Sequence, residues 1–306
     1  MKNRPWYLFF LLFWLIPALA CSGGSPTVAA PTPTAAKPKA TATTAAKPKA
    51  TATEPSVAEA TATVESAATA ESTSATTGQF DPITFSAGVL NDETAVDALD
   101  TYPDGVTVVY AVYNYSGMQD GESWRTEWKH DGVAQPDLVQ EKKWKGGESG
   151  SWWVSLLNPK GIKTGEWELD LYVGDTLQQT GKFTVEPNPA GEPDFGPITF
   201  APDKDSQDKP VNALTPSNNT LPKGTALVYA FFDGLQVPKG TAWTSQWFHN
   251  GASASDPKQH TWDFGPNEND WISFGSTDNT PLESGTYELK LSIGSRLVNI
   301  GTYIMP

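Results

Sequence analysis

Two stretches of this chain, VYAVYNYSGMQDGESWRTEWKHDG at residues 109–132 and VYAFFDGLQVPKGTAWTSQWFHNG at residues 228–251, are versions of one pattern. Their first tryptophans lie 119 residues apart, since Trp243 minus Trp124 is 119, and the second tryptophan, the histidine and the final glycine keep that spacing. So constant an offset indicates one ancestral module used twice. We therefore expect two folded units of the same kind.

Inside each stretch the largest side chains occupy every second position. In the first copy Trp124, Thr126 and Trp128 alternate with Arg125 and Glu127. A period of two predicts a β-strand with one buried face. The tryptophans that we expect to be buried are Trp124, Trp128, Trp243, Trp247 and Trp167.

Short strands separated by turn signals are predicted throughout the first copy. They are expected at residues 83–85, 106–113, 123–130, 140–144, 152–156, 166–173 and 177–185. The last two form a hairpin around Gly174 and Asp175, because apolar and polar residues alternate on either side of that turn. The same scheme recurs in the second copy. The predicted fold class is all-β, with two tandem antiparallel β-sandwiches.

The N-terminus predicts an export signal. Residues 1–20 begin with Lys2 and Arg4 and continue as an apolar run that Pro17 interrupts. A basic start followed by a short apolar run and small residues is typical of a signal peptide. The run is too short to span a bilayer comfortably, which disfavours the alternative of a permanent transmembrane helix.

The end of this segment, Ala18-Leu19-Ala20-Cys21-Ser22, resembles the lipobox of bacterial lipoproteins, in which the cysteine becomes the lipidated first residue. The family usually has Leu three residues before the cysteine, where this chain has Ala18. Cys21 is the single cysteine of the chain, so it has no intrachain disulfide partner. The resemblance implies an exported protein anchored by lipid on Cys21 to the extracytoplasmic face of a bacterial membrane. An ordinary secretory signal with a stray cysteine is the alternative.

Residues 21–79 predict a disordered tether. They are almost entirely Ala, Thr, Pro, Lys, Glu and Ser, and TAAKPKATAT at 34–43 recurs at 44–53. Such a composition buries too little apolar surface to offset the entropy of ordering. The predicted boundaries are 1–20 for the signal, 21–79 for the tether, 80–186 for the first repeat, 187–194 for a proline-rich joint and 195–306 for the second repeat.

Both repeats share an early I-T-F strand, a central V-Y-A strand, W-x-[ST]-x-W before a D-G or N-G turn, and a closing G-x-[WY]-x-L-x-L hairpin. This pattern resembles the immunoglobulin-like β-sandwich repeats of bacterial surface and secreted proteins. In those families the repeats serve as spacers, adhesion modules or accessory domains. The resemblance implies a non-catalytic protein for adhesion, assembly or interaction with an unknown protein partner. A carbohydrate-binding accessory protein with exposed aromatics and a glycan partner is the first alternative, and an unrecognised hydrolase is the second.

Charge and motif content narrow the chemistry. The net charge is −14 and both repeats are acidic, which makes nucleic acid and anionic lipid head groups poor candidate partners, and we expect neither. The chain has three histidines and lacks G-x-S-x-G, H-E-x-x-H and glycine-rich phosphate loops, so we expect no enzyme activity and no cofactor. His130 and His249 recur at the same strand end, where we favour a packing role over acid–base chemistry.

One tryptophan is the candidate ligand contact. Trp152 adjoins Trp153, and neighbours on a strand point to opposite faces, so both cannot face one core. Trp153 matches Trp271 of the second copy, whereas Asp270 stands in the place of Trp152. We therefore expect Trp152 to be exposed and to offer a small recognition surface.

A calcium site is the remaining candidate. Asp203, Asp205 and Asp208 place three carboxylates within six residues, and Ca²⁺ prefers such hard oxygen ligands. The glycine and terminal glutamate of an EF-hand loop are missing, and the first repeat has no equivalent. We favour a solvated loop, with calcium binding as the alternative.

Overall fold

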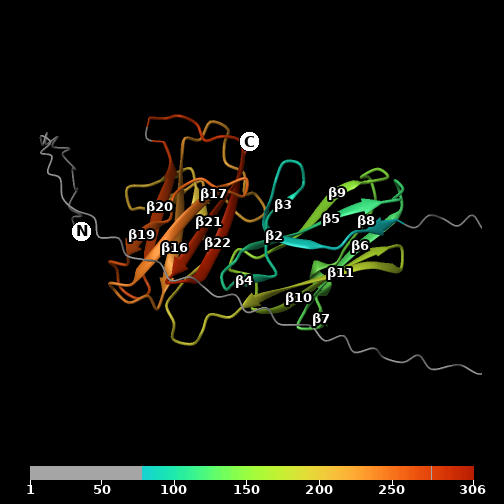
Figure 1. The fold of residues 1–306 in the computed structure, drawn as a ribbon, viewed down its shortest axis with the longest axis horizontal. Helices are drawn as coiled ribbons and strands as arrows, with labels where there is room; N and C mark the ends of the chain where they lie inside the picture. Colours follow the sequence, from blue (N-terminus) through green and yellow to red (C-terminus); the bar gives the residue numbers. More distant parts are fainter. Residues whose placement is uncertain (1–77, 277) are drawn as a thin grey trace, which may run out of the picture. The chain divides into compact units, whose positions relative to one another are not determined.

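The computed structural model describes residues 78–276 and 278–306, and the regular secondary structure of this part of the chain is β-strand apart from one short 3-10 turn (Figure 1). The first sandwich contains β1 (Gln79–Phe80), β2 (Thr84–Val89), β3 (Ala95–Ala98), β4 (Thr101–Pro103), β5 (Val108–Ser116), β6 (Ser123–His130), β7 (Val133–Ala134), the 3-10 turn η1 (Pro136–Leu138), β8 (Gln140–Lys143), β9 (Gly150–Leu157), β10 (Gly165–Val173) and β11 (Thr176–Glu186).

Two sheets face each other in this first sandwich. In one sheet β5 is central: β9 pairs along one of its edges, β1 and β2 share the other, and β3 pairs with β2. The second sheet runs β4-β11-β10-β6, with β7 and β8 both pairing with β6. Among these described strands only β4 and β11 run parallel. Two facing sheets of mainly antiparallel strands are the immunoglobulin-like arrangement.

The second sandwich repeats this scheme. Its strands are β12 (Asp194–Phe195), β13 (Thr199–Ala201), β14 (Asp203–Lys204), β15 (Pro210–Val211), β16 (Leu227–Leu235), β17 (Ala242–His249), β18 (Ala252–Ser253), β19 (Lys258–Thr261), β20 (Asn269–Gly275), β21 (Gly285–Ile293) and β22 (Arg296–Met305). β16 lies between β13 and β20, while β17 and β22 flank β21 in the other sheet. A parallel bridge between Thr220 and Ile304 stands where the first sandwich has β4 beside β11.

The seven strands predicted for the first copy are all present, with displaced ends. The prediction missed β1, β3, β4 and β7, because strands of two to four residues are too short to display a period. These strands are specified by what they pack on: β3 pairs with β2, and β4 completes the edge of β11.

The alternating tryptophans are the core, as predicted. Trp124, Trp128, Trp243 and Trp247 are all less than 5% exposed, as the alternation requires. In the first sandwich the Trp128 ring meets Phe183 of β11 edge-on at 6.3 Å between centroids. Leu169 and Leu171 of β10 are fully buried beside them. The predicted hairpin is confirmed by the register that pairs Trp167 with Phe183.

The two sandwiches contact each other through a buried polar seam. The Thr286 hydroxyl on β21 donates to the Val89 carbonyl on β2 at 2.6 Å, and the Thr302 hydroxyl on β22 donates to the Ala87 carbonyl at 2.7 Å. Gly88 lies between these two contacts, and a Cβ there would stand 3.0 Å from Thr286 Cγ2. The close approach therefore depends on the absence of a side chain at residue 88.

Charged side chains also contact each other across this seam. Glu288 of β21 is 1% exposed, and its Oε1 lies 3.2 Å from Lys290 Nζ. The same lysine reaches across to Asp97 on β3 of the first sandwich and also lies over the Phe248 ring. Burial raises the pKa of Glu288, an effect that Lys290 opposes. Removing the lysine would leave a buried carboxylate with no compensating charge.

The proline-rich joint is held by β22. Arg296 Nη1 donates to Asn188 Oδ1 at 2.9 Å, and its other terminal nitrogen donates to the Pro193 carbonyl. Asn299 donates to the carbonyls of Phe195 and Gly196 at 3.0 and 2.7 Å. These contacts anchor the start of the second sandwich. The predicted boundaries at residues 186 and 195 stay predictions.

We predict that Trp128→Ala lowers the free energy of unfolding by about 3–5 kcal/mol, because the ring fills the centre of the first core and its removal leaves a cavity. The control is Leu177→Ala, since Leu177 is 49% exposed. That change should stay within about 0.5 kcal/mol. Urea unfolding followed by circular dichroism measures both, and equal losses in the two variants would contradict the core assignment.

A second prediction concerns pH. Asp194 is 2% exposed, and burial raises its pKa to about 6, opposed by the Phe195 amide and Arg296. A carboxyl whose pKa is raised on folding stabilises the fold below its unfolded pKa, and that contribution is lost as pH rises through about 6. The side chain of Asp194→Asn cannot ionise. The free energy of unfolding of this variant, relative to that of the wild type, should therefore rise between pH 4 and pH 7, by on the order of 2 kcal/mol. Urea midpoints of both proteins across this range measure it; a constant difference would refute it.

Candidate functional site

Each sandwich is open along one side, where an edge strand of one sheet lies opposite an edge strand of the other without pairing. In the first sandwich these strands are β9 and β8. A groove of about 330 Å³ lies between them, which we call the first edge groove. Its lining residues are Glu93, Trp124, Gln140, Lys142, Trp152, Trp153, Val154 and Ser155.

The expectation that Trp152 is the exposed member of the tryptophan pair was wrong. Trp153 is 39% exposed, whereas Trp152 is half-buried and packs against the core. Trp152 lies 5.1 Å from Trp144 and 6.5 Å from Trp124 between ring centroids. It pairs in register with Tyr113, whose side chain is buried in the core.

The physical reason for the error is the open side of the sandwich. Residues there are only half covered, so the same position accepts Trp152 in one copy and Asp270 in the other, both half-buried. A mismatch between copies therefore did not mark an exposed residue. A role for Trp152 in contacting a ligand stays a prediction.

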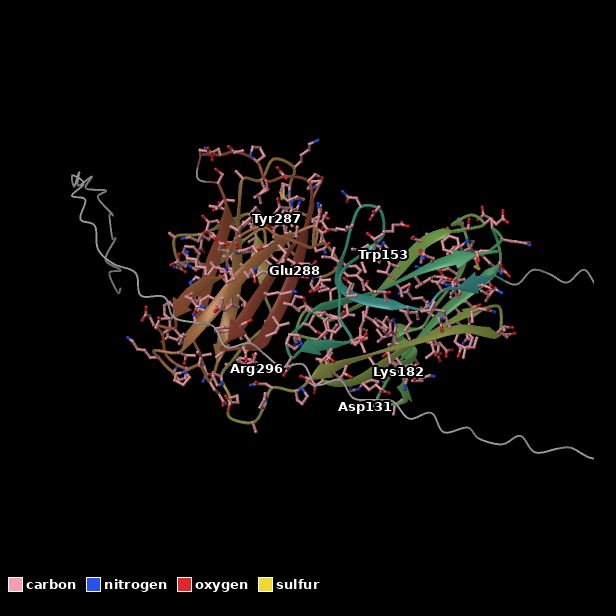
Figure 2. The ribbon with its side chains drawn as sticks, in the orientation of Figure 1. Asp131, Trp153, Lys182, Tyr287, Glu288 and Arg296 are labelled. Atoms are coloured by element: carbon pink, nitrogen blue, oxygen red, sulfur yellow. The ribbon has the colours of Figure 1, made fainter. Side chains whose placement is uncertain are left out.

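Trp153, labelled in Figure 2, lies on the outer face of its sheet, because Trp152 beside it faces the core and neighbours on a strand point to opposite faces. Its ring meets Tyr110 of β5 edge-on at 5.2 Å and 77°. The Tyr110 hydroxyl accepts a hydrogen bond of 3.1 Å from Asn219 of the second sandwich. The exposed indole is therefore backed by a tyrosine that the second sandwich holds in place.

The second sandwich has the corresponding groove, of about 390 Å³, between β20 and β19. Trp271 occupies the place of Trp153 and meets Tyr229 edge-on at 5.4 Å and 69°. Lys204 Nζ lies 4.5 Å from the centre of the Trp271 ring, a cation–π contact without counterpart in the first groove. The two grooves are thus built alike but lined differently.

The histidine of the second groove is structural. His260 stacks on Trp243 at 4.1 Å, and its Nε2 lies 2.8 Å from the hydroxyl of buried Ser245. Burial, aided by Lys258, lowers the pKa of His260 to about 4. The ring is therefore neutral at physiological pH and poorly suited to act as a general acid there.

The repeated histidines pack as expected. His130 lies on Trp167 at 4.6 Å, and its Nε2 is 2.8 Å from the Thr164 carbonyl. His249 stacks on Tyr287 at 4.4 Å, and its Nε2 is 3.1 Å from the Ser284 carbonyl. Beside this second pair lies an open hollow of about 580 Å³, lined mostly by small residues of β18, β20 and the loops next to them. Tyr287, which is labelled in Figure 2, is one of the residues that line this hollow.

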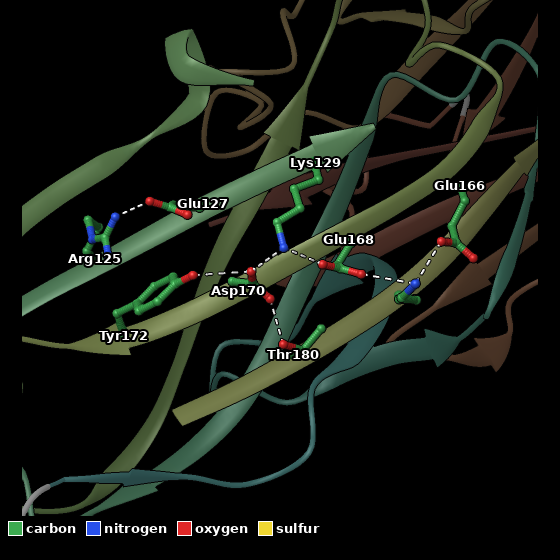
Figure 3. A network of polar contacts seen from close by, with 9 residues as sticks. Arg125, Glu127, Lys129, Glu166, Glu168, Asp170, Tyr172 and Thr180 are labelled. Atoms are coloured by element: carbon green, nitrogen blue, oxygen red, sulfur yellow. Dashed lines mark hydrogen bonds and ion pairs between the residues drawn. The ribbon is translucent and has the colours of Figure 1, made fainter. Parts of the chain in front are cut away.

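A charge ladder covers the outer face of β6, β10 and β11 (Figure 3). Lys129 Nζ lies 2.6 Å from both Glu168 and the buried Asp170. Lys182 bridges Glu166 at 2.8 Å and Glu168 at 3.0 Å. The two lysines, Lys129 first, lower the pKa of Glu168. The carboxylates of this face are paired with lysines, which suits fold stability better than acid–base chemistry.

The proposed calcium ligands form a short hairpin turn between β14 and β15. Asp205 Oδ1 accepts from the amides of Gln207 and Lys209 at 2.8 and 2.9 Å, and Asp208 Oδ1 lies 2.6 Å from Lys204 Nζ. Asp203 Oδ1 accepts from the Lys204 amide at 2.7 Å. Within residues 78–276 and 278–306 no group of three or more His, Cys, Asp or Glu residues is arranged to hold a metal ion. Calcium binding stays a prediction.

The N-terminal predictions lie outside the described residues. They concern the signal at 1–20, the lipid site Cys21 and the tether to residue 79, of which all but 78 and 79 fall there. In the described part of the chain no helix has the length and apolar character needed to cross a membrane.

No protein-family model matches this chain, and no curated protein matches it. Solved structures that match this chain include the following three, each with low sequence identity and a low TM-score. A red sea bream transglutaminase has 6% identity and a TM-score of 0.23, covering 73% of this chain and 30% of that chain. A bacterial adhesin from Mobiluncus mulieris, which contains intramolecular disulfide, isopeptide and ester cross-links, has 8% identity and a TM-score of 0.23, covering 71% of this chain and 81% of that one.

The fibronectin domains FN1–FN3 of chicken CNTN1 have 8% identity and a TM-score of 0.20, covering 64% of this chain and 60% of that one. This chain thus spans less than a third of the transglutaminase and less than two thirds of the CNTN1 fragment. Likenesses of this size carry no functional argument, and the fold rests on the strand pairing described above.

We predict different costs for the two adjacent tryptophans. Trp152→Ala should lower the free energy of unfolding by about 1–3 kcal/mol, because its ring packs on two core tryptophans. Trp153→Ala should cost no more than about 1 kcal/mol, since it loses mainly one edge-on ring contact. Urea unfolding of both variants provides the measurement. A Trp153→Ala loss as large as that of Trp152→Ala would mean that the indole of Trp153 is structural.

Proposed function

We propose that this protein is a non-catalytic lipoprotein of the bacterial cell envelope that presents two joined immunoglobulin-like sandwiches for adhesion or protein interaction. The observation that carries the proposal is the seam between the sandwiches. Thr286, Thr302 and Lys290 tie the second sandwich to β2 and β3 of the first by hydrogen bonds and an ion pair. Contacts of this kind limit the motion of one sandwich against the other, which suits a protein that presents one defined surface.

Three further features support an interaction role. The chain carries an export signal and a lipobox-like end before Cys21. Its Ala/Thr/Pro-rich tether would span roughly 45 Å as a coil, enough to lift the sandwiches off a membrane surface. The first edge groove exposes Trp153 next to polar side chains, which is the mixture of aromatic and polar residues found at recognition surfaces.

The carbohydrate-binding alternative has less support. Sugar rings stack on flat, accessible aromatic faces, whereas Trp153 and Tyr110 stand edge-on at 77° and Trp271 and Tyr229 at 69°. Lys204 also lies over the Trp271 ring. Neither pair forms a coplanar platform.

The hydrolase alternative also has less support. A glycosidase needs two carboxyl groups facing one bond, one of them with a raised pKa. In the charge ladder of the first sandwich, Lys129 and Lys182 pair with the carboxylates of Glu166, Glu168 and Asp170. Its environment lowers the pKa of Glu168, the opposite of what a general acid needs.

The envelope anchor is tested by labelling cells with a fatty-acid probe. The wild-type protein should take up label and remain with the membrane fraction, whereas Cys21→Ala should take up none and move to the soluble exported fraction. Cys21→Ala changes no residue of the described sandwiches, so the melting temperature should be unchanged and serves as a control. Unlabelled wild-type protein, or equal membrane association of Cys21→Ala, would refute the lipoprotein assignment.

A further inference from the structure

Strand β9 is an unusual sheet edge. Through one edge it pairs with β5 along its whole length, from Val108 opposite Leu157 to Tyr115 opposite Gly150. On its other edge it pairs with no strand of the described chain. Every second residue there directs backbone N–H and C=O groups away from the sheet, which makes the edge a template for another strand.

Natural proteins usually protect such edges with charged side chains, proline, a bulge or a very short strand. β9, with the sequence GSWWVSLL, has eight residues, no charge and no proline, and its pairing with β5 shows no register shift. It also carries Trp153 and Leu157, two of the six exposed large apolar side chains among the described residues. β9 therefore has none of these four devices.

The other strands that line the open sides are protected. β8 across the groove reads QEKK, so three of its four residues are charged. β19 carries Lys258 and lies beside Asp256. β20, the counterpart of β9 in the second sandwich, carries Asp270. The lack of charge is therefore a property of β9 and not of the fold.

We propose that β9 is a self-association edge, at which a second copy of this chain adds its own β9 in antiparallel orientation to form a twofold dimer with one continuous sheet. Residues directly opposite each other in an antiparallel pair share a face, so the copies can pair with Trp153 and Leu157 on the outer face of the joined sheet and Trp152 and Val154 on the core side. The indoles of Trp153 would then add apolar contact to the backbone ladder.

Among the four strands that line the open sides, charge favours a second copy at β9 over β8, β19 and β20. The chain has a net charge of −14, so two copies repel each other wherever acidic surfaces meet. A twofold contact places the same strand opposite itself, and a strand with a charge near the axis would oppose like to like. β9 carries no charge that could oppose its own copy. β8 and β20 do carry charged residues, which would face like charges across the axis.

The contact is small, because it joins one strand of eight residues with few flanking side chains. Interfaces below the standard size associate weakly. Dimerisation is therefore expected to depend on concentration, with monomer prevailing in dilute solution. Anchoring of several copies on one membrane would raise their local concentration.

The test is sedimentation equilibrium of the full chain carrying Cys21→Ser, so that lipid does not contribute to association, over a series of concentrations. The parent should show a reversible monomer–dimer equilibrium. Ser155→Lys places like charges near the axis and should weaken the association by about tenfold or more. Ser155→Thr, which keeps a small hydroxyl residue suited to a strand, should retain it.

Two controls separate the edge from general effects. Leu177→Lys adds the same charge at an exposed position of β11 and should leave the association unchanged. Hydrogen exchange should show amides of β9 gaining protection with concentration while those of β20 do not. A parent that stays monomeric at every concentration overturns the proposal, as does equal dimerisation of Ser155→Lys. Protection of β9 only on addition of a foreign peptide or glycan likewise overturns self-pairing.

Discussion

Alternation along the strands β6 and β17 is the constraint on which this structure depends. Because side chains on a strand point to opposite faces in turn, one set of positions places Trp128 and Trp247 in the two cores while the other set faces outward. The buried tryptophans then require apolar partners from the neighbouring strands, which Leu169, Leu171 and Phe183 supply in the first sandwich. A shift of one residue would exchange the two faces, so the register of the whole sheet follows from this pattern.

The outward set explains how two copies of one module came to differ. Lys129 corresponds to Phe248 and Asp170 to Lys290, while Glu168 and Glu288 are glutamates in both copies. In the first sandwich these positions form a charge ladder of lysine–carboxylate pairs. In the second, β2 and β3 of the first sandwich lie over them, Glu288 is buried, and hydroxyls of Thr286 and Thr302 donate across the seam. One sheet face thus became a solvated surface in one copy and an interface in the other.

The open side of each sandwich concentrates the features that bear on recognition. Its strands are edges, its aromatics are half-covered, and its backbone groups have free hydrogen-bonding capacity. Charged residues on β8, β19 and β20 protect these edges against pairing with another strand. Among these four strands only β9 carries no charged residue. Because the chain is acidic, two copies repel each other less at this uncharged strand than at the charged strands beside it.

The sequence by itself determined the all-β class, the duplication, the seven main strands of the first copy and the burial of its alternating tryptophans, because each follows from a period of two and a constant offset. It also marked the packing role of His130 and His249. Only the tertiary structure decided that Trp153 is exposed and Trp152 half-buried, since that depends on which side of the sandwich is left open. It likewise decided where Gly88, Glu288 and Lys290 meet, because the partners of a residue at an interface lie far away in the chain and leave no local period.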